Sequence, residues 1–271
     1  MTPSLVVIVP CYNEARRLNV AAFSRFMAAH PQVGLLLVDD GSADDTISLL
    51  EQLQSRHPRQ CQVHALQVNC GKAEAVRQGM LRALQSAPQF VGFWDADLAT
   101  PLSAIPQLTD VLVRLPAVQA VIGSRMTLAG RQVRRRWLRG FLGRCFSRTA
   151  SAVIGASLRD TQCGAKLFRA SPALAAAFAA PFLSRWIFDV EVLARLSDGD
   201  IGPLRDAIFE YPLDQWDEVG QSKVRPKDFL RAAGDLGRIF VDRVAVRRRR
   251  RADAFPVRTD EQETRPRRQA A

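Results

Sequence analysis

Short apolar runs, each followed by a polar segment of helical length, constrain the fold of this chain most tightly. The runs are rich in Val, Ile, Leu and Phe and show no polar alternation, which is typical of parallel strands buried on both faces. They span residues 5–9 (LVVIV), 34–38 (GLLLV), 63–68 (VHALQV), 90–94 (FVGFW) and 118–122 (VQAVI). This order predicts an α/β fold: a Rossmann-like, open and mostly parallel sheet with helices on both faces.

The segments between these strands predict the helices. We expect helices at residues 15–29, from Ser42 through Leu53, at 71–84 and at 102–115. Ser42 and Asp45 have the spacing of a capping box at the start of the second helix. A length of 271 residues allows one large core, and we predict a single folded domain over residues 1–245, with amphipathic and basic helical elements toward its C-terminal end.

Positive charge is concentrated in two segments of a chain whose formal net charge is +11. Such an excess indicates an anionic partner: a membrane, a nucleotide or nucleic acid. Residues 125–155 interleave arginine with aromatic residues, and Trp137 and Phe141 are spaced to share a helix face. This pattern favours a helix in a membrane interface, and the alternative is a helix packed on the domain with solvated arginines. Residues 246–271, which include Arg247–Arg251, are expected to be a disordered basic tail.

The cysteines and the hydropathy bear on the cellular compartment. Five cysteines, an odd number without CxxC spacing, predict reduced thiols in a cytosolic protein. The three histidines have no zinc-like spacing. No stretch approaches the roughly 18 apolar residues of a spanning helix, so we expect no transmembrane segment.

Acidic residues follow three of the expected strands. In open α/β sheets, ligands bind beyond the carboxyl ends of the strands, where Pro10–Glu14, Asp39–Ser42 and Asp95–Asp97 would converge. Carboxylates repel a phosphate, but Mg²⁺ or Mn²⁺ bridges the two. Asp95 and Asp97 are therefore candidate ligands of a metal that carries a diphosphate. A solvated turn is the alternative for this pair taken alone.

The segment after the first strand excludes two common nucleotide sites. It reads PCYNE, which contains neither the GxGxxG sequence of dinucleotide-binding folds nor the GxxxxGK[ST] sequence of P-loop NTPases.

Several longer motifs together resemble one enzyme family. VVIVPCYNEARRL, LLLVDDGSADDT, NCGKAEAVRQGM, FWDADLAT and IGSR follow one another in this order. They resemble the signature series of family 2 glycosyltransferases with the GT-A fold. DTQCGAKLFR, RWIFDVEVLARL and EYPLDQWDEVGQSK resemble the dolichyl-phosphate β-glucosyltransferase branch, close to the dolichyl-phosphate mannose synthases. The resemblance implies that residues 1–245 are a GT-A catalytic domain.

The resemblance also implies roles for individual residues. The donor-binding set would be Pro10, Tyr12, Glu14, Val38, Asp40, Lys72, Asp95, Ala96, Asp97 and Lys223. Asp95 and Asp97 would bind the metal, and Arg125 and Arg139 would hold the acceptor phosphate. Asp189 would hydrogen-bond the sugar or groups near the metal, so the catalytic set would be Asp95, Asp97, Arg125 and Asp189.

Two positions differ from motifs of related enzymes, and several assignments have alternatives. Ala99 stands where some mannose synthases have a glutamine metal ligand, and Ala165 stands where the glucosyl branch has a bulky aromatic residue. Tyr12 could instead be a core aromatic, and Asp39 a cap for the loop that follows it. Arg125 could be a partner in a surface salt bridge, and Lys223 a mobile surface lysine.

The reaction implied by the resemblance is a metal-dependent, inverting hexosyl transfer. UDP-glucose is the favoured donor and GDP-mannose the alternative, with a polyprenyl phosphate as acceptor and a β-linked lipid as product. The protein would then bind peripherally to the inner face of the cytoplasmic membrane, and no nucleic-acid partner is expected.

Three other functions remain open from the sequence. One is transfer to another glycan or lipid-linked acceptor, and another is a binding module on a degenerate GT-A domain. The third is nucleic-acid binding, which the net charge favours but the acidic crevice opposes.

Overall fold

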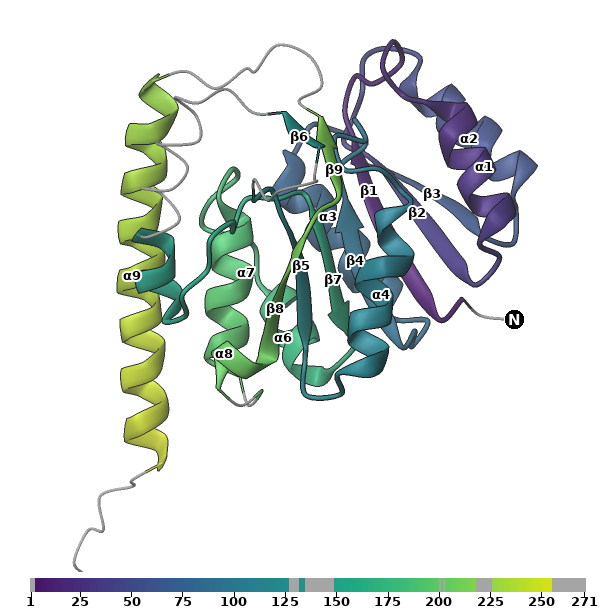
Figure 1. The fold of residues 1–271 in the computed structure, drawn as a ribbon. Coiled ribbons are helices and arrows are strands. Elements are labelled where there is room, and N and C mark those ends of the chain that lie inside the picture. The colour runs from purple at the N-terminus through teal and green to yellow at the C-terminus, as the bar shows by residue number, and fades with distance from the viewer. Residues whose placement is uncertain are drawn as a thin grey trace, which may run out of the picture.

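The computed structural model describes residues 3–126, 132–134, 149–199, 201, 203–217 and 226–254. Within these ranges, seven strands form one sheet in the order β3-β2-β1-β4-β7-β5-β8 (Figure 1). The strands are β1 (Leu5–Cys11), β2 (Val33–Asp39), β3 (Cys61–Ala65), β4 (Phe90–Trp94), β5 (Ala120–Ser124), β7 (Ala165–Arg169) and β8 (Ile208–Pro212). Strand β7 runs antiparallel to β4 and β5, and the other described pairs are parallel. The predicted open, mostly parallel sheet is confirmed.

The central strands are buried because both of their faces are covered by helices. All seven residues of β2 are buried, and β1 pairs with β2 from Leu5↔Val33 to Cys11↔Asp39. This explains the uninterrupted apolar runs, since neither face of these strands meets water. Pro10 lies inside β1 rather than just after it, beyond the point at Ile8 where the pairing with β4 ends.

Helices cover the two faces of the sheet in separate groups. α1 (Val20–Ala29), α2 (Thr46–Arg56) and α4 (Ala104–Arg114) pack on one face. α3 (Lys72–Leu84), α6 (Pro172–Ala179) and α7 (Phe188–Ser197) pack on the other. The short helix α8 (Leu204–Ala207) precedes β8, and β6 (Gln132–Arg134) pairs in parallel with β9 (Gln215–Asp217).

A long C-terminal helix, α9 (Pro226–Ala254), lies along the outer side of α7 (Figure 1). Ala232, Leu236 and Ile239 bury one face of α9 in the core layer that α3, α6 and α7 form. Arg243 is also buried, and its Nε donates to Asp198 Oδ1 at 3.0 Å.

The position of α9 corrects the predicted boundary of the tail. The prediction of disorder is wrong for residues 246–254, because α9 continues through the arginine run to Ala254. Residues 255–271 lie outside the described residues.

Two predicted helix starts are also wrong, because side chains near them form other hydrogen bonds. The first helix begins at Val20, where Asn19 Oδ1 accepts a hydrogen bond from the Ala22 N–H at 3.0 Å. The predicted capping box does not form, because Ser42 Oγ donates to Asp39 Oδ1 at 2.5 Å instead. The second helix therefore begins at Thr46 without a side-chain cap.

Two further expectations concern helices that would cross or lie on a membrane. None of the helices in the described ranges is long and apolar enough to cross a membrane. The predicted interfacial helix around Trp137 and Phe141 lies outside the described residues.

Candidate functional site

Lys72 and Asp95 meet at the carboxyl edge of the sheet. Lys72 is the first residue of α3 and Asp95 directly follows β4, and Lys72 Nζ lies 2.5 Å from Asp95 Oδ1. Both side chains remain accessible, with 40% and 35% of their surfaces exposed. Burial acts to lower the pKa of Lys72, but the negative charges of Asp95 and Asp189 outweigh it and raise the pKa. The ammonium therefore stays charged at neutral pH, and it faces the pair of acids that the sequence predicted as metal ligands.

Asp97 adds a second carboxylate to this cluster. Its Oδ1 accepts a hydrogen bond from the Ala99 N–H at 3.0 Å. Burial raises the pKa of Asp97, and the negative charge of Asp95 raises it further. The Ala99 N–H and the positive charge of Lys72 act against this rise without cancelling it. Two carboxylates that share one ammonium retain a negative charge.

This donor set fits a hard divalent cation such as Mg²⁺ or Mn²⁺, which prefers carboxylate oxygens. In the described ranges, no group of three or more His, Cys, Asp and Glu side chains is placed to hold a metal ion. The assignment of Asp95 and Asp97 as metal ligands therefore stays a prediction.

Asp40, at the end of β2, supports the loop that leads into α3. Its buried carboxylate accepts hydrogen bonds from the Cys70 N–H at 2.7 Å and the Gly71 N–H at 2.8 Å. Burial raises the pKa of Asp40, although these two N–H groups act to lower it. Gly71 has a φ of +93°, a backbone conformation that glycine adopts without strain. The role of Asp40 in this structure is thus to place the residues directly before Lys72.

The other predicted nucleotide-binding residues differ in accessibility. Tyr12 is 45% exposed beyond the end of β1, so it is not the core aromatic of the alternative interpretation. Val38 is fully buried in the core, and Pro10 is half-buried. Glu14 is buried, with its Oε1 2.5 Å from Arg17 Nη2. Among these residues, Tyr12 offers the most accessible side chain to a ligand.

Within the described residues, Ala96 of the predicted donor set and the neighbouring candidate Asp39 make no side-chain contact that favours a ligand. Ala96, between the two candidate metal ligands, is buried and apolar. Asp39 caps the loop after β2 through Ser42, as its alternative interpretation proposed.

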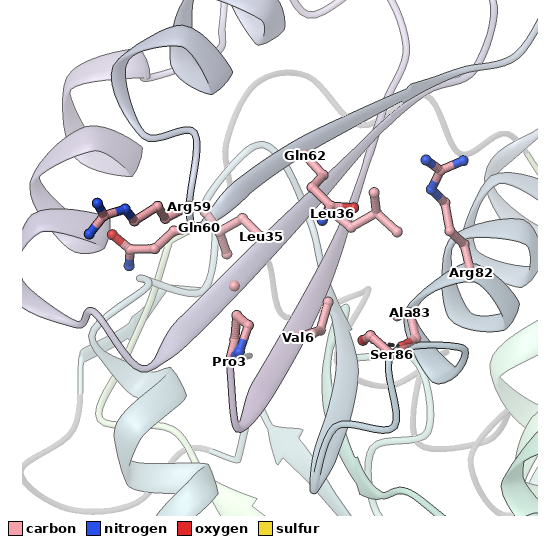
Figure 2. A pocket seen from close by; sticks show the side chains of 11 residues that line it. Pro3, Val6, Leu35, Leu36, Arg59, Gln60, Gln62, Arg82, Ala83 and Ser86 are labelled. Carbon is pink, nitrogen blue, oxygen red and sulfur yellow. Dashed lines mark hydrogen bonds between the residues drawn. The ribbon is translucent and has the colours of Figure 1, made fainter. Parts of the chain in front are cut away.

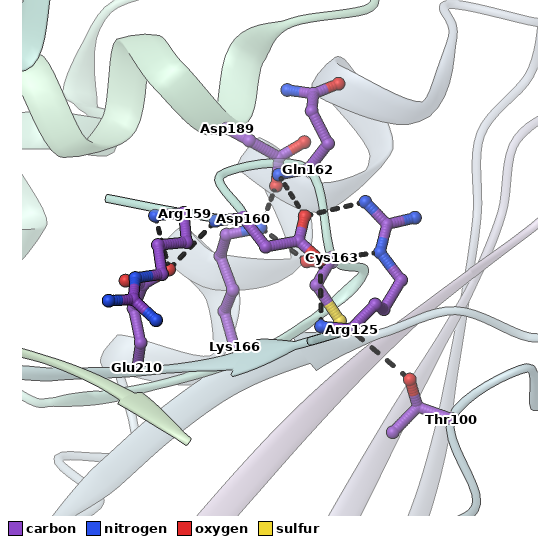
Figure 3. Close-up of polar contacts among 9 residues, drawn as sticks. All are labelled: Thr100, Arg125, Arg159, Asp160, Gln162, Cys163, Lys166, Asp189 and Glu210. Carbon is purple, nitrogen blue, oxygen red and sulfur yellow. Dashed lines mark hydrogen bonds and ion pairs between the residues drawn. The ribbon is translucent and has the colours of Figure 1, made fainter. Parts of the chain in front are cut away.

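Arg125, which follows β5, forms a two-bond ion pair with Asp160 (Figure 3). Its Nε and Nη2 donate to the two carboxylate oxygens at 2.7 and 2.6 Å, and its backbone N–H donates to the same carboxylate at 2.9 Å. Burial acts to lower the pKa of Arg125, but the charge of Asp160 outweighs it and raises the pKa. The guanidinium lies 5.4 Å from the centre of the Trp216 ring. The salt bridge of the alternative interpretation is present, but it is buried rather than on the surface.

Asp189, in the first turn of α7, pairs with Lys166 of β7. Lys166 Nζ lies 2.5 Å from Asp189 Oδ1, and Lys166 is fully buried. Glu191 turns to a different set of partners, with its Oε1 2.7 Å from Arg195 Nη2. Asp160 and Lys166 were not singled out from the sequence, because their partners lie 35 and 23 residues away along the chain. Arg139 and Lys223 lie outside the described residues.

A small pocket lies at the opposite edge of the sheet, near the amino ends of β1, β2 and β3 (Figure 2). It encloses about 110 Å³, and its lining includes Pro3, Leu35, Gln60 and Arg82. The pocket contains none of the predicted site residues, so the candidate site is the acidic edge at the other end of the strands.

Comparison with known proteins identifies the family. The model of glycosyl transferase family 2 matches residues 6–174. This chain is a family 2 glycosyltransferase. It is 30% identical over 246 residues to a dolichyl-phosphate beta-glucosyltransferase of Trichomonas vaginalis, covering 86% of this chain and 70% of the relative. It is 32% identical over 252 residues to the dolichyl-phosphate beta-glucosyltransferase of Drosophila melanogaster, covering 88% and 74%.

Solved structures confirm the fold of this glycosyltransferase. Glucosyl-3-phosphoglycerate synthase of Mycobacterium tuberculosis superposes with a TM-score of 0.61 at 19% identity, covering 88% of this chain and 80% of that one. A structure of the same enzyme with Mn²⁺, UDP-glucose and phosphoglyceric acid gives a TM-score of 0.63, also at 19% identity, covering 88% and 79%. The predicted GT-A fold is therefore confirmed.

Proposed function

We propose that this glycosyltransferase moves glucose from UDP-glucose to a polyprenyl monophosphate. The product is a β-linked polyprenyl-phosphate glucose, formed with inversion at the anomeric carbon. The observation that carries the proposal is the cluster of Lys72, Asp95 and Asp97 at the carboxyl edge of the sheet. The choice of substrates is supported by the similarity to dolichyl-phosphate beta-glucosyltransferases over most of the chain and by the UDP-glucose bound to a protein of the same fold.

The charged cluster suits a nucleotide diphosphate leaving group. Asp95 and Asp97 would hold Mg²⁺ or Mn²⁺, which stabilises negative charge on a departing diphosphate. Lys72 brings a second positive charge to the same place, and its charge is secured by the acids around it. Tyr12 is accessible at the same edge and is the candidate for contact with the base or ribose.

The acceptor requires binding and orientation more than proton removal. A phosphate monoester is largely ionised near neutral pH, so its oxygen attacks without a strong general base. Arg125 is our candidate for holding this phosphate together with Arg139, through its Nη1 group, which does not donate to Asp160. Asp160 already fixes the Arg125 side chain, which limits the entropy lost on binding.

Helix α9 supports binding to a membrane surface, where a polyprenyl acceptor resides. Phe240 and Val241 are 51% and 67% exposed on this helix. The arginine run Arg247–Arg251 continues the same helix. Apolar and basic groups together favour an anionic lipid interface, at about 1 kcal/mol for each basic residue near the surface. Sedimentation with phosphatidylglycerol vesicles tests this, and we expect Phe240→Ser/Val241→Ser to lower the bound fraction.

The reaction itself is tested by mass spectrometry of lipid products. Purified protein with Mn²⁺ or Mg²⁺ receives a short polyprenyl phosphate and either UDP-glucose or GDP-mannose, and 3-phosphoglycerate serves as a competing soluble acceptor. We expect a hexosyl lipid from UDP-glucose. It should be lost in Asp95→Ala/Asp97→Ala and retained in the control Asp110→Ala, which changes an exposed acid of α4. A product from GDP-mannose alone would overturn the donor, and transfer to 3-phosphoglycerate alone would overturn the acceptor.

A further inference from the structure

The turn before β7 touches the candidate metal ligand Asp95 directly. Strands β4 and β7 pair in antiparallel register with Trp94 opposite Ala165, so the next residues, Asp95 and Gly164, meet at the end of the ladder. The Asp95 N–H donates to the Gly164 carbonyl oxygen at 3.1 Å. The backbone of Asp95 is thus fixed by this turn as well as by its own strand.

The side chain of Asp95 also depends on Gly164. A Cβ atom at Gly164 would lie 1.9 Å from Asp95 Oδ2 and 2.2 Å from Asp95 Cγ, and the third nearest atom would be Oδ1 of the same carboxylate. The carboxylate therefore occupies the space that any side chain at position 164 would fill. Since the nearest atoms all belong to one side chain, a methyl group at this position would push the Asp95 carboxylate aside.

Lys166 holds this turn in place through two hydrogen bonds. Its Nζ donates to the Cys163 carbonyl oxygen and to Asp189 Oδ1, both at 2.5 Å (Figure 3). The ammonium also lies 5.3 Å from the centre of the Phe93 ring in β4. A fully buried ammonium is costly without such partners, so this arrangement joins the turn to the first turn of α7.

We infer that Gly164 and Lys166 are positioning residues for Asp95. Gly164 leaves the space in which the Asp95 carboxylate lies. Lys166 fixes the carbonyl group of Cys163, the residue before Gly164. Asp189 acts in this unit as the counter-ion of Lys166. The inference rests on the proposed function in one respect, that Asp95 binds the divalent metal. Outer residues that orient a metal ligand typically change metal affinity by about 10- to 100-fold when they are replaced.

The test measures Mn²⁺ binding by electron paramagnetic resonance, without donor or acceptor. We expect Gly164→Ala to weaken Mn²⁺ binding by about 10- to 100-fold, with little change in melting temperature. UDP binding in EDTA should stay within about twofold of the wild type. The matched control is Gly34→Ala in β2, whose Cβ would meet the Pro3 side chain at the other edge of the sheet. This control should bind Mn²⁺ like the wild type.

A second pair of variants tests Lys166. Lys166→Met leaves the Asp189 charge buried without its cation, so this variant is expected to be unstable. Lys166→Met/Asp189→Leu removes both charges together and keeps the local net charge. We expect the double variant to fold and still to bind Mn²⁺ at least about tenfold more weakly, because the Cys163 carbonyl has lost its donor.

The outcomes separate this inference from the proposed function. Wild-type Mn²⁺ affinity in Gly164→Ala, or in the folded double variant, would overturn it. So would a wild-type protein that binds no Mn²⁺. A wild-type protein that binds Mn²⁺ but forms no glucosyl lipid would overturn the proposed function and leave the positioning of Asp95 intact.

Discussion

Two regions of the site differ in how their charged side chains are paired and in how exposed they are. At the carboxyl edge of the sheet, here called the donor edge, Lys72 forms an ion pair with Asp95 and acts on Asp97 only through its charge. The side chains of Lys72 and Asp95 remain 40% and 35% exposed. Beside β5 and β7, by contrast, two ion pairs are largely buried. Arg125 pairs with Asp160, with side chains 16% and 7% exposed, and the pair of Lys166 and Asp189 is 0% and 7% exposed.

This difference indicates that one region binds a ligand and the other stabilises the fold. Incompletely neutralised acids are expensive to maintain and are expected where a ligand completes the charge balance. Fully paired buried charges are costly to disrupt and therefore hold the backbone in one arrangement. Replacing residues of the donor edge should then reduce activity without unfolding the protein, and replacing residues of the paired network should reduce stability.

The largest effect is expected for Asp97→Asn. Glucosyl transfer should fall by about 100-fold or more, since the proposed metal ligand at the leaving group would lose its charge. The free energy of unfolding at pH 7 should stay the same or rise, because a raised pKa means that the fold disfavours the charged form of Asp97. Initial rates and urea denaturation measure the two quantities. A strongly destabilised Asp97→Asn protein would place this residue with the paired network instead.

Asp160→Asn should show the opposite pattern. Arg125 donates three hydrogen bonds to this carboxylate, and a hydrogen bond to a charged group contributes about 1.5–3 kcal/mol. We expect the free energy of unfolding in urea to drop by at least this amount. Unchanged stability would show that the ion pair of Arg125 and Asp160 does not stabilise the fold.

The affinity for Mn²⁺ should begin to fall at a pH above the ordinary pKa of an aspartate. The metal binds the deprotonated carboxylates, so protons compete with it as the pH falls. Burial and the charge of Asp95 raise the pKa of Asp97, and affinity should therefore decline at a higher pH than the ordinary aspartate value of about 3.9 implies. A Mn²⁺ titration over a pH series measures this. In Asp97→Asn, the weaker remaining affinity should lack this step.

The smallest effect is expected for Gly237→Ala in α9. No heavy atom lies within 4 Å of the position that its Cβ would occupy. Alanine in an exposed helix interior is favoured over glycine by about 1 kcal/mol. The melting temperature should rise by a few degrees at most. A fall in melting temperature would show that the space beside Gly237 is filled by a contact that the added methyl group disturbs.

The sheet and the donor edge were predictable from local patterns. Buried apolar runs predicted β1, β2 and β4, and their shared direction predicted that the residues after them, including Asp95, lie at one edge of the sheet. Lys72 was indicated only by the family motifs. The family motifs pointed to the same carboxylates. Such features depend on a few neighbouring residues and on the general rule for ligand sites in open sheets.

The remaining features depend on contacts that are distant in sequence. Arg125 and Asp160 are 35 residues apart, and neither the pairing nor its burial has a local signal. Ser42 matched a capping box, but Asp39 competes for its hydroxyl. The arginine run after Val246 has the composition of a disordered tail. In the structure it continues helix α9, whose residues Leu236 and Ile239 are buried against α3, α6 and α7.

The most direct test is calorimetric titration with UDP in the presence of Mn²⁺ and in EDTA. We expect Mn²⁺ to strengthen UDP binding by at least about tenfold in the wild-type protein and in Asp160→Asn, at a temperature where both are folded. We expect no such gain in Asp95→Asn/Asp97→Asn. An equal gain from Mn²⁺ in all three proteins would contradict the assignment of donor binding to the two carboxylates.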